Sequence, residues 1–224
     1  LRATAVGAAR TAEELGKAFP EYRLIDSSGD HVVPEIGSQA VLVVATPGGE
    51  PVATGGYAAA ALLDADLMLA RPELRTAEDT LRRWFQVSAL VRPEGRIVVA
   101  GNAAHPVVQA LIRSDPAGFA SRELLERLAA HLPPAWPVAE ISGEPTAVTA
   151  FLERLTLPAA AELLGPMPVF PPNAPGEQTI RAIVRIPPGG LRPLAAALKS
   201  AAAASSAAKV PALYTVSINP INFR

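Results

Sequence analysis

Hydrophobic residues in the first half of the chain form short runs with the length of buried strands, and the segments between them carry apolar residues at helical spacing. The predicted strands are 3–8, 22–25, 41–45, 58–63 and 96–100. The predicted helices are about 11–19, Pro72 to about Leu90, and 105–113. Thr11 is the predicted N-cap of the first helix, because Glu14 follows at the spacing of a capping box. This alternation predicts an α/β domain with a parallel sheet over residues 1–113.

The second half of the chain has a different pattern, which begins after Asp115-Pro116. A long helix is predicted at about 117–131, and it ends before the proline pair Pro133-Pro134. The following strands are predicted at 136–142, 162–169, 179–186 and 213–218, with helices at 145–155 and 191–208. The order β-α-β-β-α-β is that of a ferredoxin-like sandwich. Residues 114–224 are therefore predicted to form a second, smaller α+β domain.

Composition excludes several classes of function. The chain has 20 basic and 21 acidic residues, so any contact with a nucleic acid must come from a local patch and not from net charge. It has no cysteine, and its three histidines are far apart, so no metal site is expected. No long apolar run or leader pattern is present, which predicts a cytoplasmic protein without a membrane partner. The first residue is Leu1, so the chain is expected to be a piece of a longer protein.

Two features at predicted strand ends could carry chemistry. Asp64 and Asp66 follow a strand, which is a common place for the active site of an α/β enzyme. A metabolic enzyme with a regulatory ferredoxin-like domain is therefore one possible interpretation, and a structural role of the two aspartates is the other. The paired glycines of the loop 47–56 lead into a strand and not into a helix N-terminus, so a structural loop is favoured over a phosphate-binding loop.

The order of several short motifs resembles the PriA family, the primosomal protein N′ replication-restart helicases, in its actinobacterial versions. The strings similar to the family's own are Ala9-Arg-Thr-Ala-Glu-Glu-Leu15, Val41-Leu-Val-Val-Ala-Thr46, Leu63-Asp-Ala-Asp-Leu67, His105-Pro-Val-Val-Gln-Ala-Leu111, Glu123–Arg127 with Leu132-Pro-Pro134, Leu164-Gly-Pro-Met-Pro168 and Val216-Ser-Ile-Asn-Pro220. The resemblance implies a RecA-like helicase lobe, the second of the motor, over 1–113. It implies the family's C-terminal domain over 114–224.

The sequence departs from the family where the motor chemistry lies. After Gln86-Val87 the family has two arginines, and here Leu90 and Pro93 stand at those positions. An arginine finger of this kind typically accelerates phosphoryl transfer by about 10³–10⁵. Arg92 and Arg96 are the remaining local candidates for nucleotide binding. The chain therefore resembles a degenerate lobe with no catalytic residue of its own.

The family resemblance also implies cofactors and partners. Zinc and ATP are expected only in an upstream part of the parent protein, and no cofactor is expected in this chain. The implied partners are forked or single-stranded DNA, single-stranded DNA-binding protein, and primosome or replicative helicase components. Candidate DNA contacts are Arg181 and Arg185, which share one face of a predicted strand, and Arg82 and Arg83, with Glu78 and Asp79 one turn away as pairing partners.

The loop Pro171–Gln178 lacks the basic and aromatic residues that hold single strands, so it is not expected to contact DNA. The resemblance leads to the expectation of a replication-restart protein that binds forks and scaffolds primosome assembly without unwinding DNA. The alternative is an active ATP-dependent 3′-5′ DNA helicase of the PriA type.

Overall fold

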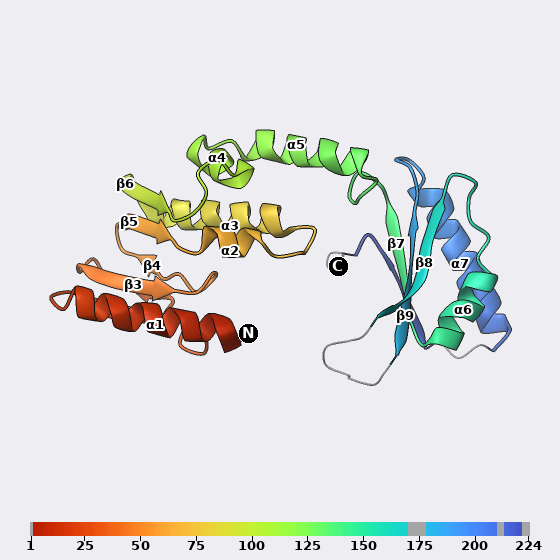
Figure 1. Ribbon diagram of the computed structural model, residues 1–224, viewed down its shortest axis with the longest axis horizontal. Coiled ribbons are helices and arrows are strands. Elements are labelled where there is room, and N and C mark those ends of the chain that lie inside the picture. Colours follow the sequence, from red (N-terminus) through yellow and green to blue (C-terminus); the bar gives the residue numbers. More distant parts are fainter. Residues whose placement is uncertain (1, 170–177, 210–212, 221–224) are drawn as a thin grey trace. The chain divides into compact units, whose positions relative to one another are not determined.

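The computed structural model describes residues 2–169, 178–209 and 213–220 (Figure 1). Contacts between residues divide the chain into two compact units, Leu1–Phe119 and Ala120–Arg224. Each unit has its own hydrophobic core. The two units are described separately below.

The first unit begins with one long helix, α1 (Arg2–Ala18), so the prediction of a strand at 3–8 was wrong. Alanine has the highest helix propensity, and the alanine-rich start of the chain extends the helix beyond the predicted capping box. Thr11 is consequently inside the helix, where its hydroxyl donates to the Gly7 carbonyl at 2.9 Å and caps nothing. One of the five strands predicted for the parallel sheet is therefore absent.

The strands of the first unit form three separate parallel pairs. They are β1 (Arg23–Ser27) with β3 (Val41–Ala45), the short β2 (Glu35–Ile36) with β4 (Val52–Ala53), and β5 (Tyr57–Leu62) with β6 (Val91–Val99). The parallel orientation agrees with the prediction. In the described part of the chain, however, these pairs stand in place of the single five-stranded sheet that was expected.

The core of the first unit is built mainly by three helices on the β5–β6 pair. These helices are α2 (Ala65–Leu69), α3 (Thr76–Leu90) and α4 (Pro106–Ile112). Trp84 and Leu81 of α3 are buried and pack with Val107 and Val108 of α4. The helical spacing of apolar residues in this segment therefore corresponds to a buried face of α3. His105 caps α4, since its Nδ1 accepts a hydrogen bond from the Val107 amide at 3.2 Å.

The helix α5 (Pro116–Ala129) precedes the β-α-β-β-α-β series of the second unit. The elements of that series are β7 (Val138–Gly143), α6 (Pro145–Glu153), β8 (Glu162–Val169), β9 (Thr179–Arg185), α7 (Leu191–Ala207) and β10 (Tyr214–Ile218). The four strands form one sheet in the order β10-β7-β9-β8, and every neighbouring pair is antiparallel.

Helices α6 and α7 lie together on one face of this sheet (Figure 1). Alternate strand residues point toward the helices, and Ile141 and Val184 are completely buried against Phe151 and Leu194. The residues between them in sequence point to the opposite face, since side chains alternate along a strand. That opposite face is called the polar face below. Its described residues include Glu140, Ser142, Glu162, Met167, Thr179, Arg181, Ile183, Arg185, Thr215 and Ser217.

Candidate nucleic-acid interface

The two positions where the arginine pair was expected lie at the junction of α3 and β6. Leu90 is the last residue of α3, and β6 begins at Val91 with no loop between them. Pro93, Arg92 and Arg96 are exposed residues of β6. The proline favours the extended backbone that this strand adopts. Neither Arg92 nor Arg96 makes a side-chain hydrogen bond or ion pair with another described residue, and Arg96 lies opposite Ala59 in the strand pair.

The glycine-containing loop after β3 is held by a buried serine of the neighbouring strand. Ser27 is completely buried, and its hydroxyl donates to the Gly49 carbonyl at 2.6 Å and accepts from the Val33 amide at 2.9 Å. A Cβ on Gly49 would lie 2.8 Å from the Ser27 carbonyl oxygen, so the backbone approach requires glycine. The loop is thus a tightly packed structural element.

A side chain of the protein already accepts the hydrogen bond that this loop could offer to an anion. The Gly48 amide donates to the carboxylate of Glu50 at 2.9 Å, so this N–H group already has a negatively charged acceptor. The Arg83 guanidinium lies close by, because a Cβ on Gly48 would be 3.2 Å from its Nη1. A phosphate group would have to displace the Glu50 carboxylate before it could reach the Gly48 amide.

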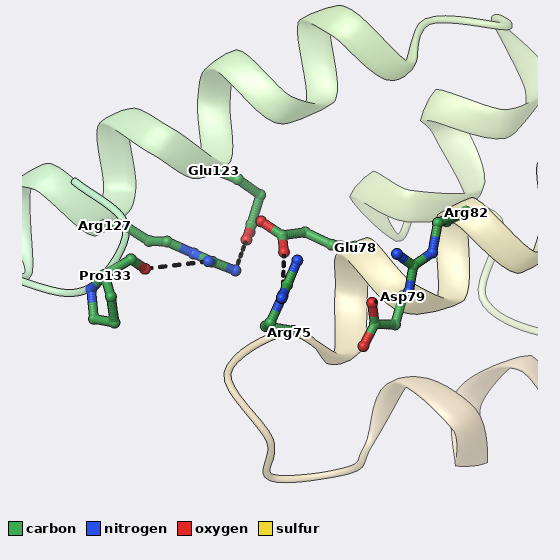
Figure 2. A network of polar contacts seen from close by, with 7 residues as sticks. All are labelled: Arg75, Glu78, Asp79, Arg82, Glu123, Arg127 and Pro133. Carbon is green, nitrogen blue, oxygen red and sulfur yellow. Dashed lines mark hydrogen bonds and ion pairs between the residues drawn. The ribbon is translucent and has the colours of Figure 1, made fainter. Parts of the chain in front are cut away.

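The arginines of α3 differ in their pairing. Arg82 donates to Asp79 at 2.7 Å, which is the ion pair that the sequence predicted (Figure 2). Glu78 pairs with Arg75 at 3.4 Å. Arg83 is exposed, and its guanidinium lies beside Gly48 of the loop after β3. No described carboxylate forms an ion pair with Arg83. Arg82 and Arg83 therefore do not form one basic patch.

The aspartates at the end of β5 have a structural environment. The Asp66 carboxylate accepts a hydrogen bond from the Asn102 amide at 3.0 Å, which ties the segment after β6 to the start of α2. Asp64 has a left-handed backbone conformation before α2, and its side chain caps no amide. This arrangement supports the structural interpretation of Asp64 and Asp66.

The two candidate arginines on β9, Arg181 and Arg185, also differ in their ion pairing. Arg185 donates through its Nε to Glu162 Oε2 at 2.7 Å, and the two residues are direct neighbours across β9 and β8. The other oxygen of Glu162 lies 3.9 Å from Nδ1 of His131, whose ring stacks on the buried Trp136 with 3.7 Å between ring centroids. Glu162 therefore neutralises Arg185 and holds it within a cluster of side chains.

Arg181 points to the same polar face but has no such carboxylate. Its neighbours across the sheet are Met167 on β8 and Ser142 on β7. The Ser142 hydroxyl lies 3.1 Å from that of Thr215 on β10. The Nε atom of Arg181 is covered by protein atoms and has no hydrogen-bond partner among the described residues. Of the four candidate arginines, Arg181 and Arg83 thus lack a described carboxylate partner.

Another arginine, which was not among the candidate site residues, has a structural role. Arg127 on α5 is buried; it donates to the Glu123 carboxylate at 3.1 Å and to the Pro133 carbonyl at 3.2 Å (Figure 2). These contacts join the end of α5 to the chain that leads to β7. The signal in the sequence was the spacing of Glu123 and Arg127, four residues apart on a helix.

Several expectations concern absent features. Within residues 2–169, 178–209 and 213–220, no group of histidine, aspartate and glutamate side chains is placed to hold a metal ion. No helix in the same described part of the chain has the length and apolar character needed to span a membrane. Most of the loop Pro171–Gln178, which was not expected to contact DNA, lies outside the described residues.

Comparison with known proteins connects these observations to one family. Residues 128–221 match the family model described as the primosomal protein N C-terminal domain. The chain is 43% identical over 231 residues to the probable replication restart protein PriA of Mycobacterium leprae, which covers 99% of this chain and 36% of that relative. This chain belongs to the PriA family.

Two other PriA relatives match at higher identity over a shorter region. The probable replication restart proteins PriA of Mycobacterium tuberculosis (strain CDC 1551 / Oshkosh) and Mycobacterium bovis are each 49% identical over 178 residues, covering 76% of this chain and 27% of each relative. The chain spans about a third of the length of the curated relatives it matches. Membership of the PriA family leaves the metabolic-enzyme interpretation without support.

Within this PriA domain, the sequence pointed to Arg181 and Arg185 but missed the residues that distinguish them. Glu162, Ser142 and Thr215 come from three other strands, and their relation to the arginines depends on strand register. One signal was available: Glu140 and Ser142 alternate with the apolar Ala139 and Ile141 on a predicted strand. That alternation marks a sheet with one polar face.

Proposed function

We propose that this chain takes part in replication restart as a DNA-binding and scaffolding part of its parent protein, and that the parent does not unwind DNA by ATP hydrolysis. The observation that carries the proposal is the replacement of the expected arginine pair by Leu90 and Pro93. Leucine and proline side chains cannot stabilise the charge of a transferring phosphoryl group. The mycobacterial relatives are named as probable replication restart proteins, and these names support the assignment of this chain to replication restart.

The surroundings of the altered motif support the loss of the motor function. Arg92 and Arg96 are on the strand β6 and not at the end of α3, where Leu90 lies. The Gly48 amide is occupied by the Glu50 carboxylate, which repels an approaching phosphate. The loop segment itself also lacks lysine, so its own residues supply no positive charge for coupling DNA to a nucleotide, and the neighbouring cation is Arg83 of α3.

We propose the finer fold assignments together with this function. A RecA-like lobe over 1–113 is supported by the parallel strand pairs with helices α2, α3 and α4 packed on one of them. A ferredoxin-like domain over 114–224 is supported by the β-α-β-β-α-β order and by a sheet whose strands run β10-β7-β9-β8. In that sheet, the first and third strands of the series are central.

We propose forked or single-stranded DNA, single-stranded DNA-binding protein and primosome or replicative helicase components as partners. The family membership supports this set, and the exposed Arg83, which has no ion pair with a described carboxylate, supports a direct contact with DNA. We propose no cofactor for this chain, and we assign ATP and zinc to the upstream part of the parent protein.

The test is ATP hydrolysis by the intact parent protein, measured with and without forked DNA, together with fork binding on the same sample. Tight fork binding without turnover is the expected result. DNA-stimulated hydrolysis would overturn the proposed loss of motor activity. A parent that binds neither forked nor single-stranded DNA would overturn the DNA-binding role.

The alternative function is an active ATP-dependent 3′-5′ helicase that obtains its arginine from another position. Arg92 and Arg96 are exposed and carry the required charge, which is the observation in its favour. The Arg92→Ala and Arg96→Ala variants of the parent protein separate the two functions. A motor that uses one of them loses turnover by about 10³ or more, whereas a scaffold keeps its fork affinity and has no turnover to lose.

A further inference from the structure

An aromatic stack just after α5 presents a histidine ring at the surface of the second unit. The rings of His131 and Trp136 are nearly parallel, with 16° between their planes and 3.7 Å between their centroids. Trp136 is buried, whereas 40% of the His131 side chain is exposed. Because the indole covers one face of the imidazole, the exposed area of His131 belongs to the outer face of the ring and to its edge.

The edge of the His131 ring has one side toward the protein and one side toward solvent. Its Nδ1 faces the Glu162 carboxylate, whose Oε1 lies 3.9 Å away. Its Nε2 makes no hydrogen bond with a described residue. In the described part of the chain, the buried polar side-chain atoms without a partner are Arg181 Nε and Ser205 Oγ, so Nε2 of His131 is not a covered atom. The outer face and the Nε2 edge are consequently accessible to a ligand.

His131 occupies the position after a helix at which glycine is the usual residue. Its φ is 56°, in the left-handed region. The His131 amide donates to the Leu128 carbonyl at 3.3 Å, and the Leu132 amide donates to the Arg127 carbonyl at 2.8 Å, which is the hydrogen-bond pattern of a Schellman motif. A side chain is strained in this conformation, and non-glycine residues held in it cluster at binding and active sites.

The chain between His131 and Trp136 is fixed by hydrogen bonds from two sides. The Trp136 amide donates to the Leu132 carbonyl at 3.0 Å. The buried Arg127 side chain donates to the Pro133 carbonyl at 3.2 Å (Figure 2). The imidazole is therefore held in place before any ligand arrives, so binding on its outer face loses little side-chain entropy.

The charges beside the ring favour a neutral flat ligand over an anion. Glu162 and Arg185 form an ion pair at 2.7 Å, and both are partly exposed. The pair is neutral in sum, so a phosphate gains little next to His131. An aromatic face instead attracts another flat ring. Unpaired nucleobases are such rings, and proteins hold them by stacking on aromatic side chains that include histidine.

We propose that the outer face of His131 stacks on a nucleobase of single-stranded DNA, with Trp136 as the support behind the ring and Glu162 as the residue that orients it. This inference rests on the proposed DNA-binding function and names one contact of the strand. All three residues belong to the second unit. Since every base has a π face and no phosphate is neutralised, the contact tolerates any base and adds nothing to the salt dependence of binding.

The experiment measures binding of the full 224-residue chain to two fluorescent single strands by anisotropy. One strand is oligothymidine of about 20 nucleotides, and the other is an abasic oligomer of the same length and charge. His131→Gly removes the ring and suits the left-handed backbone, so the fold is retained. This variant is expected to bind oligothymidine about tenfold more weakly, with an unchanged slope of log K against log salt, and to bind the abasic oligomer as the wild type does. His31→Gly, at an exposed histidine of the first unit, is the matched control.

A second variant separates stacking from the charge and hydrogen bonds of the imidazole. His131→Phe keeps a flat ring at the same position and is expected to bind oligothymidine within about threefold of the wild type. In addition, the ring-proton resonances of His131, identified by their absence in His131→Gly, should move upfield when oligothymidine is added, because a stacked base adds a ring current. The abasic oligomer should leave these resonances in place.

Four results would contradict the inference. Equal affinity of His131→Gly and His31→Gly for oligothymidine would show that no base stacks on His131, while the proposed DNA-binding function stands. An equal loss of affinity for the abasic oligomer would assign the effect to the strand backbone and not to a base. Binding by the parent but not by the 224-residue chain would place the contact outside the second unit. Absence of binding by the chain and by the parent would remove the proposed function as well.

Discussion

Arg185 and Glu162 form a 2.7 Å ion pair across strands β9 and β8, which removes one of two candidate arginines from the surface charge of the sheet. Both side chains are partly exposed, so the pair stabilises the fold only modestly, by about 0.2–1 kcal/mol. Its greater effect is electrostatic, because the Glu162 carboxylate cancels the field of the Arg185 guanidinium, so the pair has no net charge that would attract an anionic ligand. Arg181, four residues earlier on the same face, has no carboxylate partner among the residues that the structure describes.

Glu162→Gln should therefore strengthen binding of the chain to a single-stranded oligonucleotide about two- to threefold, because Arg185 loses its neutralising carboxylate. Fluorescence anisotropy at low salt measures this change. The double variant Glu162→Gln with Arg185→Gln removes both charges and should return the affinity to within twofold of the wild type. Unchanged binding by Glu162→Gln alone would contradict the explanation.

Arg127→Ala is expected to destabilise the chain by about 3 kcal/mol, because the change leaves the Glu123 carboxylate and the Pro133 carbonyl without their buried donor. Urea denaturation followed by circular dichroism gives the free energy of unfolding. Arg122→Ala, at an exposed position on the same helix, is the control and should cost less than about 0.5 kcal/mol. Similar losses in both variants would show that the buried contacts contribute little.

Gly49→Ala tests the packing of the loop that follows β3. A Cβ at this position would be 2.8 Å from the Ser27 carbonyl oxygen and 3.2 Å from that of Thr46, so the backbone has to move. The expected cost is about 2 kcal/mol or more in the free energy of unfolding. Gly37→Ala has no atom within 4 Å of the new methyl group and should be neutral or slightly stabilising. Equal stability of the two variants would rule out the tight loop.

Glu144 makes the stability of the second unit depend on pH. Hydrogen bonds from the Thr146 hydroxyl and from the amides of Thr146 and Ala147 lower the pKa of this carboxyl, which caps α6. A carboxyl whose pKa is lower in the folded state stabilises the fold above its unfolded value, and that contribution disappears as the pH falls through the folded value.

The stability difference between wild type and Glu144→Ala should consequently be largest at about pH 7 and shrink as the pH approaches about 3. Thermal melting across this range measures the difference. Glu153→Ala, an exposed carboxylate near the end of the same helix, is the control and should show a smaller dependence on pH. A Glu144→Ala difference that does not vary with pH would contradict the capping role.

The unit 2 elements were predicted well because their signals are local. The strand β8 was placed at 162–169 by its apolar content between turn residues, and the structure has it at Glu162–Val169. In unit 1, the β-branched run of β3 was placed equally well, at Val41–Ala45. Residues 3–8 were predicted wrongly, since an alanine-rich segment fits both a short buried strand and a helix, and the adjoining helix extends into it. The short strands β2 and β4 and the helix α2 were not predicted.

The amino-acid sequence by itself determined the order of the strands and helices in the second unit, the apolar faces of its helices, and the loss of the arginine pair at Leu90 and Pro93. Only the tertiary structure decided which arginine keeps its charge available. Arg185 and Glu162 are separated by 23 residues, and Ser142 and Thr215 by 73. Such pairs depend on strand order and register, which arise when apolar faces pack together over the whole unit and not from any local pattern.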